Sequence, residues 1–348
     1  MDRVRQFLSA AKCLSENELK RISDALLDML GVTSRFSGDS AKRLSKCRKC
    51  ESERIIKFGV DKNGKQRYRC KCCGVTFTET SYSVVSYTRH SSDVWEKYIH
   101  LLLVGASLEE CAFRCGISVR TAFDWRHKIL NALQRDQDNR VLAGIIEADE
   151  MYLPISYKGN HKKGKRFVMP RQSFQRGSDN RSNNFPKVCI MCAVERNGQS
   201  YGEVLGQGQP TTRKVTYAFE KRIAPDSIML SDRTKGIKSF FKKKTEIQLI
   251  QLKASVAGKK YGGAPEVRGI YHIQTVNNFH NRLQRFLRPY NGVSTKYLNH
   301  YINLFVWIEN HKSMESRLED ALQRCISEKD TYIASKNLPD RAPVPCVA

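Results

Sequence analysis

The sequence predicts an α/β protein in which a mixed sheet with flanking helices follows two smaller units. Three observations support this fold class: short apolar runs alternate with helical patterns after residue 141, two CxxC pairs lie before residue 82, and two helical patterns flank Gly116 between these regions. We therefore expect five segments. They are a helical head at 1–40, a metal-binding ribbon at 41–82, a helical unit at 90–134, the α/β domain at 141–310, and a C-terminal helix and tail at 311–348.

The charge of the chain indicates a polyanionic partner. Lys and Arg number 60 against 35 Asp and Glu, which gives a net charge of +25 over 348 residues. Phosphate backbones are the commonest polyanions, and an anionic membrane surface is the alternative. No run approaches the length of about 18 apolar residues that a membrane helix requires, and the N-terminus lacks the apolar centre of a signal peptide. We expect a cytoplasmic protein that binds double-stranded DNA and no membrane.

The two ends of the chain carry helical patterns without readable chemistry. In the head, apolar residues recur at helical spacing from Val4 to Ala11 and from Leu19 to Leu30. Oligomerisation and DNA contact are both open as roles for the head, and the C-terminal helix and tail indicate no role.

The strongest local pattern is the pair of CxxC motifs. Cys47 and Cys50 are followed, after nineteen residues, by Cys70 and Cys73, which is a spacing typical of a four-thiolate zinc site. The residues between the motifs fit two short strands around an Asn-Gly turn, the hairpin of a zinc ribbon. Four protein ligands leave no open position for a substrate, so we expect one structural Zn²⁺. Clustered cysteines also favour a reducing compartment over disulfides.

The helical unit has the order helix, glycine-containing turn, helix. The first helix ends at Gly116 and the second begins near residue 119. This order is typical of a helix-turn-helix, whose second helix reads the major groove of DNA; a plain helical hairpin is the alternative. On the outward face of the second helix, beside His127, the DNA-binding candidates are Arg120, Thr121, Arg126 and Lys128.

A carboxylate interrupts the apolar strand predicted at residues 144–153. Alternation along this strand places Glu147 and Asp149 on one face and Glu150 on the other, so Glu150 is expected to point away from Asp149. Burying an ionised carboxylate is costly unless it is paired or binds a metal. We therefore expect Asp149 to hold a divalent cation together with other oxygen ligands. The alternative is a frayed strand end at which Asp149 bonds a loop.

A basic insertion at 156–187 follows this strand. It contains nine Lys or Arg against one acid, Asp179, and shows no periodicity. Two interpretations are open: a mobile loop that clamps a DNA backbone, and a disordered solvated insertion. The DNA-binding candidates in it are Lys162, Lys163, Lys165 and Arg166.

The rest of the α/β domain supplies a second strand-borne carboxylate and a helix with a polar stripe. Strands are expected at 188–194, 201–205, 228–232 and 247–252, with a helix at 210–224. Asp232 ends the third of these strands. A later helix from Gln274 has an inward stripe, in which His280 is interpreted as a core residue, and an adjacent polar stripe that begins at Asn277.

Together these features resemble the bacterial insertion-sequence transposases of the DDE superfamily. The resemblance spans Cys47 to Trp307, and the stretch from His272 to Trp307 is its most specific part. It implies a ribonuclease-H-like catalytic domain that cuts DNA at element ends, joins the 3′ ends to target DNA and acts as a homo-oligomer on DNA. By the same resemblance, the catalytic positions that hold two Mg²⁺ ions are matched by Asp149, Asp232 and Asn277.

One position departs from the family pattern. The family places a lysine seven residues after the third ligand, where this chain has Gln284. Arg282, Arg285 or Arg288 then remain as candidates for that phosphate contact, and we include Arg282 and Arg285 among the DNA-binding residues. The alternative function is a catalytically silent, sequence-specific DNA-binding regulator derived from a transposase.

Overall fold

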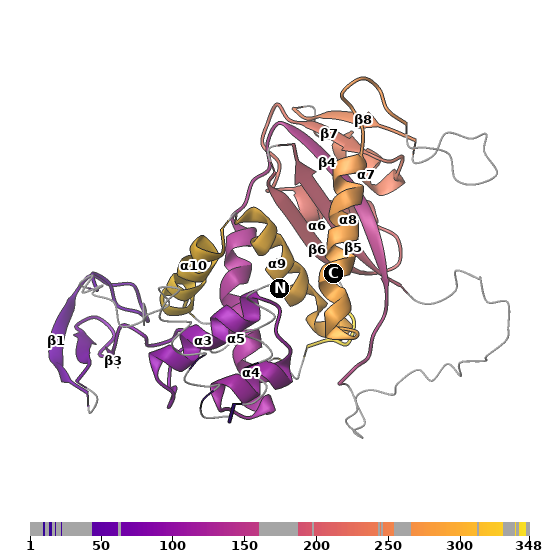
Figure 1. Cartoon of the computed structure of the whole chain (residues 1–348). Coiled ribbons are helices and arrows are strands. Elements are labelled where there is room, and N and C mark those ends of the chain that lie inside the picture. Colours follow the sequence, from indigo (N-terminus) through magenta and orange to yellow (C-terminus); the bar gives the residue numbers. More distant parts are fainter. Residues whose placement is uncertain are drawn as a thin grey trace, which may run out of the picture.

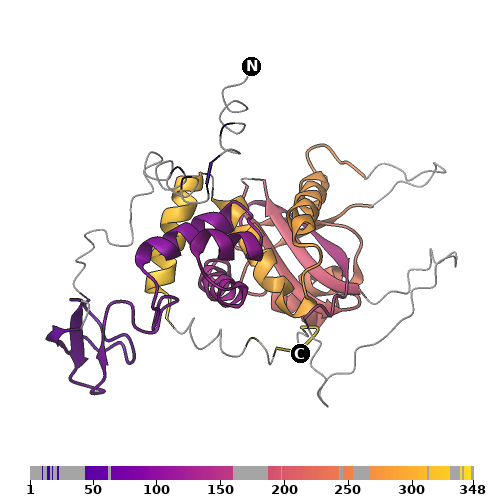
Figure 2. The ribbon, with the colours of Figure 1, turned by 60° about the horizontal axis from the view of Figure 1, so that its bottom comes forward.

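A computed structural model describes residues 44–61, 64–159, 187–196, 198–242, 244, 246–253, 266–311, 313–329, 338 and 341–345, and isolated positions before residue 44. The predicted helical head, apart from those positions, and the basic insertion from residue 160 to 186 lie outside the described residues. The described chain forms a ribbon, a helical unit and an α/β domain (Figures 1 and 2). None of the helices in the described ranges has both the length and the apolar character needed to cross a bilayer.

The ribbon is a three-stranded antiparallel sheet in the order β1, β2, β3 (Ile55–Val60, Gln66–Cys70, Thr76–Phe77). Its small core consists of Cys47, Cys70 and Phe77, with Tyr68 and Cys73 packed against them. Arg48 joins the ribbon to the helical unit, because its Nη2 donates to the Ile326 carbonyl oxygen at 2.7 Å. The ribbon therefore lies beside the end of the C-terminal helix and apart from the α/β sheet (Figure 1).

Three consecutive helices form the first part of the helical unit: α3 (Ser92–Leu103), α4 (Leu108–Cys115) and α5 (Val119–Asp138). Ser107 and Ser118 cap α4 and α5, accepting the backbone N–H groups of Glu110 at 3.1 Å and Thr121 at 3.0 Å. Gly116 ends α4 with φ 62°, a left-handed conformation that glycine adopts without a steric penalty. This is the helix, turn, helix order that the sequence predicted.

Two later helices complete this unit. These are α9 (Leu298–Asn310) and α10 (Met314–Ser327); both pack on α5, and α10 also packs on α3. Trp95 stacks on Trp125 with 3.6 Å between ring centroids, and Leu304 of α9 and Leu322 of α10 are buried in the same core. The C-terminal helix, for which the sequence indicated no role, thus supports the helix-turn-helix.

The α/β domain is built on a five-stranded sheet in the order β6, β5, β4, β7, β8. The strands β4, β5 and β6 are antiparallel neighbours, whereas β7 and β8 run parallel to β4. Three antiparallel strands followed by two parallel ones form a ribonuclease-H-like mixed sheet, so the predicted fold class is confirmed. The strand bounds are Ile145–Pro154 for β4, Lys187–Glu195 for β5, Ser200–Gln207 for β6, Ile228–Ser231 for β7 and Gln248–Gln251 for β8.

Helices cover both faces of this sheet. One face packs on α6 (Thr212–Phe219) and α7 (Lys235–Phe241), and the other packs on α8 (Gln274–Leu287) and α9. Alternate residues of β5 enter the two cores: Cys192 faces α8 and α9, while Cys189 faces α6 and α7. Both cysteines are fully buried and pack as small apolar residues of the two cores.

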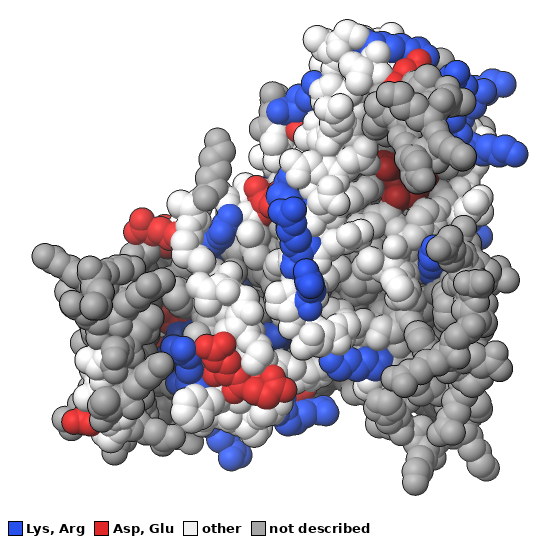
Figure 3. Space-filling model, turned by 45° about the vertical axis from the view of Figure 1, so that its right-hand side comes forward, with Lys and Arg blue, Asp and Glu red and all other residues white. Residues whose placement is uncertain are grey.

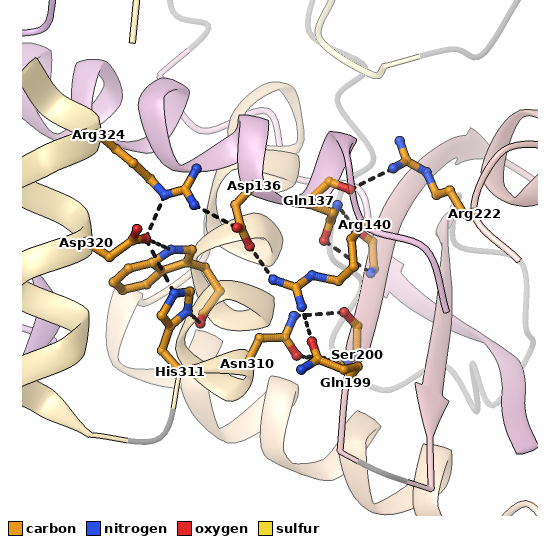
Figure 4. A network of polar contacts seen from close by, with 12 residues as sticks. Asp136, Gln137, Arg140, Gln199, Ser200, Arg222, Asn310, His311, Asp320 and Arg324 are labelled. Atoms are coloured by element: carbon orange, nitrogen blue, oxygen red, sulfur yellow. Dashed lines mark hydrogen bonds and ion pairs between the residues drawn. The ribbon is translucent and has the colours of Figure 1, made fainter. Parts of the chain in front are cut away.

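The end of α5 is bonded to the sheet through a polar network (Figure 4). The Gln137 side-chain amide donates to the Gly202 carbonyl oxygen at 2.8 Å and to Asn303 Oδ1 at 2.7 Å. Asp136 accepts from Arg324 of α10 at 2.8 Å and pairs with Arg140. Because α9 also belongs to both cores, the helical unit and the α/β domain share elements and are not joined by a simple linker.

Candidate active site

Two carboxylates meet where the parallel pairing of β4 and β7 ends. The last paired residues are Ala148 and Ser231, so Asp149 and Asp232 are the next residue of each strand and lie side by side. A ligand oxygen of Asp149, of Glu150 and of Asp232 all lie within 4.8 Å of one another. The structure therefore brings together two of the three predicted catalytic residues, Asp149 and Asp232.

Glu150 joins this cluster, which corrects the expectation that it points away. The Thr234 hydroxyl donates to Glu150 Oε2 at 3.1 Å and also to Asp232 Oδ1, and thereby ties the two acids together. Because β7 ends at Ser231, β4 has no neighbouring strand on that side at residue 150. The segment after β7 therefore brings Asp232 and Thr234 within reach of Glu150 as well as of Asp149.

The electrostatics of the cluster favour a bound cation. Burial, and then the neighbouring charge of Asp232, raise the pKa of Asp149 to about 7 and that of Glu150 to about 7. Glu150 Oε1 is buried without a hydrogen-bond partner among the described residues. Three clustered carboxylates, two of which have a raised pKa and one of which has an unpaired oxygen, are suited to a hard divalent ion such as Mg²⁺.

Helix α8 borders the cluster. His280 Nδ1 lies 3.9 Å from Asp149 Oδ2, and burial lowers the pKa of this histidine to about 4, so the ring is neutral at pH 7. His280 is buried in the inward stripe as expected, but it also reaches the edge of the carboxylate cluster. Asn277 is half-buried and lies on the same helix, about one turn before His280.

The four predicted zinc ligands also converge. The Cys47 and Cys73 sulfurs are 3.7 Å apart and those of Cys50 and Cys70 are 3.6 Å apart, close to the edge of about 3.8 Å in a tetrahedron with Zn–S bonds of about 2.3 Å. The backbone N–H of Lys49 donates to Cys47 Sγ at 3.4 Å, and that of Cys72 donates to Cys70 Sγ at 3.3 Å. This geometry fits a metal ion held by four thiolates.

Comparison with known proteins bears on the part of the chain that contains the carboxylate cluster. Residues 141–310 match the family model of the ISXO2-like transposase domain. A Halobacterium salinarum protein, described as an uncharacterized protein in transposable element ISH50, is 22% identical over 266 residues, which are 74% of this chain and 83% of that protein. These two matches support an insertion-sequence transposase of the DDE type, with its transposase domain at residues 141–310. The resemblance inferred from the sequence is confirmed.

Two solved structures are remote likenesses of the transposase. The Mos1 strand transfer complex is 13% identical, with 68% of this chain and 79% of that chain covered and a TM-score of 0.22. The Mos1 mariner paired end complex with Mn is 14% identical, with 70% and 80% covered and a TM-score of 0.19.

Helix α5 of the transposase presents fewer basic side chains than the sequence indicated. Arg120 is exposed and pairs with Asp124 at 3.2 Å, while Thr121 and Lys128 are half-buried. Arg126 and His127 are not on the outward face. The guanidinium of Arg126 is 1% exposed and donates to the Ala106 carbonyl oxygen at 2.7 Å, so Arg126 is withdrawn as a DNA contact.

The other basic candidates differ in their exposure and in their hydrogen-bond partners. Arg285 is exposed on α8, whereas Arg282 donates through Nε and Nη2 to Glu309 Oε2 at 2.9 and 2.6 Å. Lys162, Lys163, Lys165 and Arg166 lie outside the described residues. On the face shown in Figure 3, Lys and Arg side chains lie over both the helical unit and the α/β domain of the transposase.

Proposed function

We propose that this transposase cuts DNA at the ends of its insertion sequence and joins the 3′ ends to target DNA by phosphodiester hydrolysis and transesterification. The observation that carries the proposal is the convergence of Asp149, Glu150 and Asp232 where the parallel pairing of β4 and β7 ends, with the pKa of two of them raised. Perturbed carboxylates in one place are typical of a catalytic centre.

Each residue has a defined part in this proposal. Asp149 and Asp232 would hold two Mg²⁺ ions where the pairing of β4 and β7 ends, and Glu150 would supply a further oxygen. Asn277 on α8 is the third ligand that the family pattern implies, and its neutral amide oxygen binds more weakly than a carboxylate. When bound, the ions would lower the pKa of an attacking water or 3′-hydroxyl and stabilise the leaving oxygen.

The ribbon holds one structural Zn²⁺ through Cys47, Cys50, Cys70 and Cys73 in this proposal. The four sulfurs leave no ligand position for a substrate, so the ion fixes the fold of the ribbon.

Double-stranded DNA, first the element ends and then the target, is the proposed partner. The net charge of +25 supports it, and Arg120 and Arg285 are exposed candidates for contacts on the helix-turn-helix and on α8. The transposase is proposed to act as a homo-oligomer on this DNA.

The test uses purified full-length protein and labelled DNA that carries the termini of its own element, with Mg²⁺ or Mn²⁺. Asp149→Asn and Asp232→Asn should each lower the rate of strand cleavage by about 10³-fold, the equivalent of about 4 kcal/mol of transition-state stabilisation. Asp226→Asn is the matched control, because Asp226 is exposed just before the same strand β7 whose other end leads to Asp232. Tight DNA binding without cleavage by the unmutated protein would instead establish the silent regulator.

A further inference from the structure

A second acid on the catalytic strand has a different environment from Asp149. Glu147 lies two residues before Asp149 on β4 and therefore on the same face, but its side chain is fully buried and does not join the carboxylate cluster. A buried carboxylate is stable only when its oxygens are bonded. The groups that bond Glu147 indicate what it does.

Glu147 caps the N-terminus of α8 from a distant strand. Its Oε2 accepts the backbone N–H groups of Thr275 at 2.7 Å and Val276 at 3.1 Å, and its Oε1 accepts the Thr275 hydroxyl at 2.8 Å. The first N–H groups of a helix have no partner within the helix, and Ile273, which precedes α8, has no side chain that can cap it. A negative charge at this end is also favoured by the helix dipole.

Arg196 and His272 contact the same carboxylate, and Arg196 also bonds the loop before α8. Arg196 Nε donates to Glu147 Oε1 at 2.8 Å, and Arg196 Nη2 donates to the Ile270 carbonyl oxygen at 2.8 Å. His272 Nδ1 lies 3.4 Å from Glu147 Oε1. The backbone N–H of Arg196 donates to the Ile145 carbonyl oxygen at 3.0 Å, so this arginine is itself fixed to β4.

The helix therefore lies along the catalytic strand in a fixed register. Its start is bonded to Glu147, and His280, farther along it, is 3.9 Å from Asp149. Asn277 lies between these two points on the helix. The distance from Asp149 to the polar side chains of α8 thus depends on where Glu147 holds the first turn.

We propose that Glu147 is a positioning residue, which holds α8 so that Asn277 and His280 face the metal site formed by Asp149 and Asp232. This inference rests on the proposed function, because it assumes that the cluster binds a divalent ion. It assigns to a buried acid outside the catalytic set the task of placing the third ligand. Groups that orient metal ligands typically change metal affinity or activity by about 10- to 100-fold when they are replaced.

A double-mutant cycle on metal affinity tests the proposal. Calorimetry measures Mn²⁺ binding to the full-length protein without DNA. The proteins compared are the unmutated chain, the single variants Glu147→Gln, Asn277→Ala and His280→Ala, and the two double variants that combine Glu147→Gln with each change on α8. Glutamine keeps the length of the side chain but offers one acceptor oxygen in place of two. The matched control is Glu203→Gln, which alters a buried acid on β6 that bonds Asn299 and not α8.

We expect Glu147→Gln to weaken Mn²⁺ binding by about 10-fold, while Glu203→Gln stays within about twofold of the unmutated protein. Glu147 acts through Asn277 or His280. In the variant that lacks this ligand, adding Glu147→Gln should weaken Mn²⁺ binding by less than about twofold. An equal loss in all backgrounds, or unchanged affinity in a folded Glu147→Gln protein, would overturn the proposal.

A milder variant keeps the test informative if Glu147→Gln does not fold. Thr275→Val removes one hydroxyl donor to Glu147 and preserves the shape of the side chain, and we expect Mn²⁺ binding about threefold weaker, in line with the loss of one hydrogen bond. Unchanged affinity in folded Thr275→Val would then count against the proposal. Asp149→Asn distinguishes a failure of the proposed metal site from a failure of the role proposed for Glu147. If Asp149→Asn binds Mn²⁺ as tightly as the unmutated protein does, the proposed metal site itself is wrong.

Discussion

The two ligand clusters of this transposase are assembled in opposite ways. The cysteine cluster takes all four sulfurs from residues 47–73, on a ribbon with a core of its own. The carboxylate cluster joins residues 149 and 150 to residue 232 across two strands, and it borders a helix that begins only at residue 274. One cluster is local and complete, whereas the other depends on the whole α/β domain.

This difference separates a group that stabilises the fold from one that destabilises it. The sulfurs have tetrahedral spacing and backbone N–H donors, so a metal ion would complete the ribbon. The carboxylates crowd like charges in a partly buried place, and one oxygen of Glu150 has no partner among the described residues. Active sites commonly retain such unfavourable charge because it binds the ion and the substrate.

The largest change in folding stability should follow from the loss of Zn²⁺ from the ribbon. Cys50→Ser, or a chelator, should unfold it, because a structural Zn²⁺ contributes on the order of 10 kcal/mol to the folding of a small domain. Limited proteolysis within residues 44–80 and the zinc content of the protein measure this. Cys72→Ser is the control, since Cys72 is exposed and lies outside the cluster. A metal-free ribbon that resists proteolysis would break the comparison.

Whereas Zn²⁺ should stabilise the ribbon, the ionised carboxylates should lower the free energy of unfolding of the α/β domain. Since the pKa of Asp149 is raised from its usual 3.8 to about 7 in the folded protein, the folded chain keeps a proton that the unfolded chain loses between these values. Without added divalent ions, the contribution of this group to the free energy of unfolding should therefore be greatest below about pH 4 and fall by roughly 2–4 kcal/mol as the pH rises to about 7.

Asp149→Asn should remove the part of this pH dependence that comes from residue 149. It should also raise the thermal unfolding temperature at pH 8 of the protein without added divalent ions. Thermal unfolding at pH 5 and pH 8 measures both effects, with Asp226→Asn as the control. If Asp149→Asn lowers the unfolding temperature at pH 8, the carboxylate cluster stabilises the fold and the contrast with the ribbon fails.

Glu150 should contribute to metal binding. We expect Glu150→Gln to weaken Mn²⁺ binding by about 10-fold, or 1.4 kcal/mol, because one of three oxygen donors loses its charge. Calorimetry at pH 7.5 checks this. Glu246→Gln is the control, because Glu246 is exposed and lies just before β8. Unchanged affinity would show that Glu150 is a neighbour of the site and not a ligand.

The smallest effect is expected at Thr234. Its hydroxyl donates to both Asp232 and Glu150 and lowers the pKa of Glu150, so Thr234→Val should raise that pKa further. Mn²⁺ must then displace a proton more often, and the affinity at pH 7 should fall about threefold, a change close to the loss of one hydrogen bond. Thr216→Val is the control, because the Thr216 hydroxyl bonds only the carbonyl oxygen of Thr212 within α6. Equal affinities of the two variants would contradict this role.

The same contrast explains what could be predicted from the sequence. The cysteine ligands are close along the chain, so their spacing was sufficient to predict the cluster. Asp149 and Asp232 could be found because each interrupts or ends an apolar strand. Glu150 was misplaced, because the end of β7 opposite residue 148 sets its environment and no pattern within residues 144–153 contains that information.

Long-range packing also explains the misplaced basic residues of α5. Arg126 and His127 alternate with the apolar positions of a two-helix unit and so were predicted to face solvent. In the structure α9 and α10 also pack on α5, and His127 Nδ1 lies 2.8 Å from His300 Nδ1 of α9. A helix that contacts elements far away in the sequence is buried over more of its circumference than its own pattern indicates.

The unbroken course of α5 has a geometric consequence for the proposed reaction. Its 20 residues extend over about 30 Å, from the exposed Arg120 at one end to Gln137, which is bonded to the sheet, at the other. A duplex held at the first end would meet the carboxylates at a constant number of base pairs from the recognised sequence. Because one added residue turns a helix by about 100°, the length of α5 would determine which phosphodiester is presented for cutting.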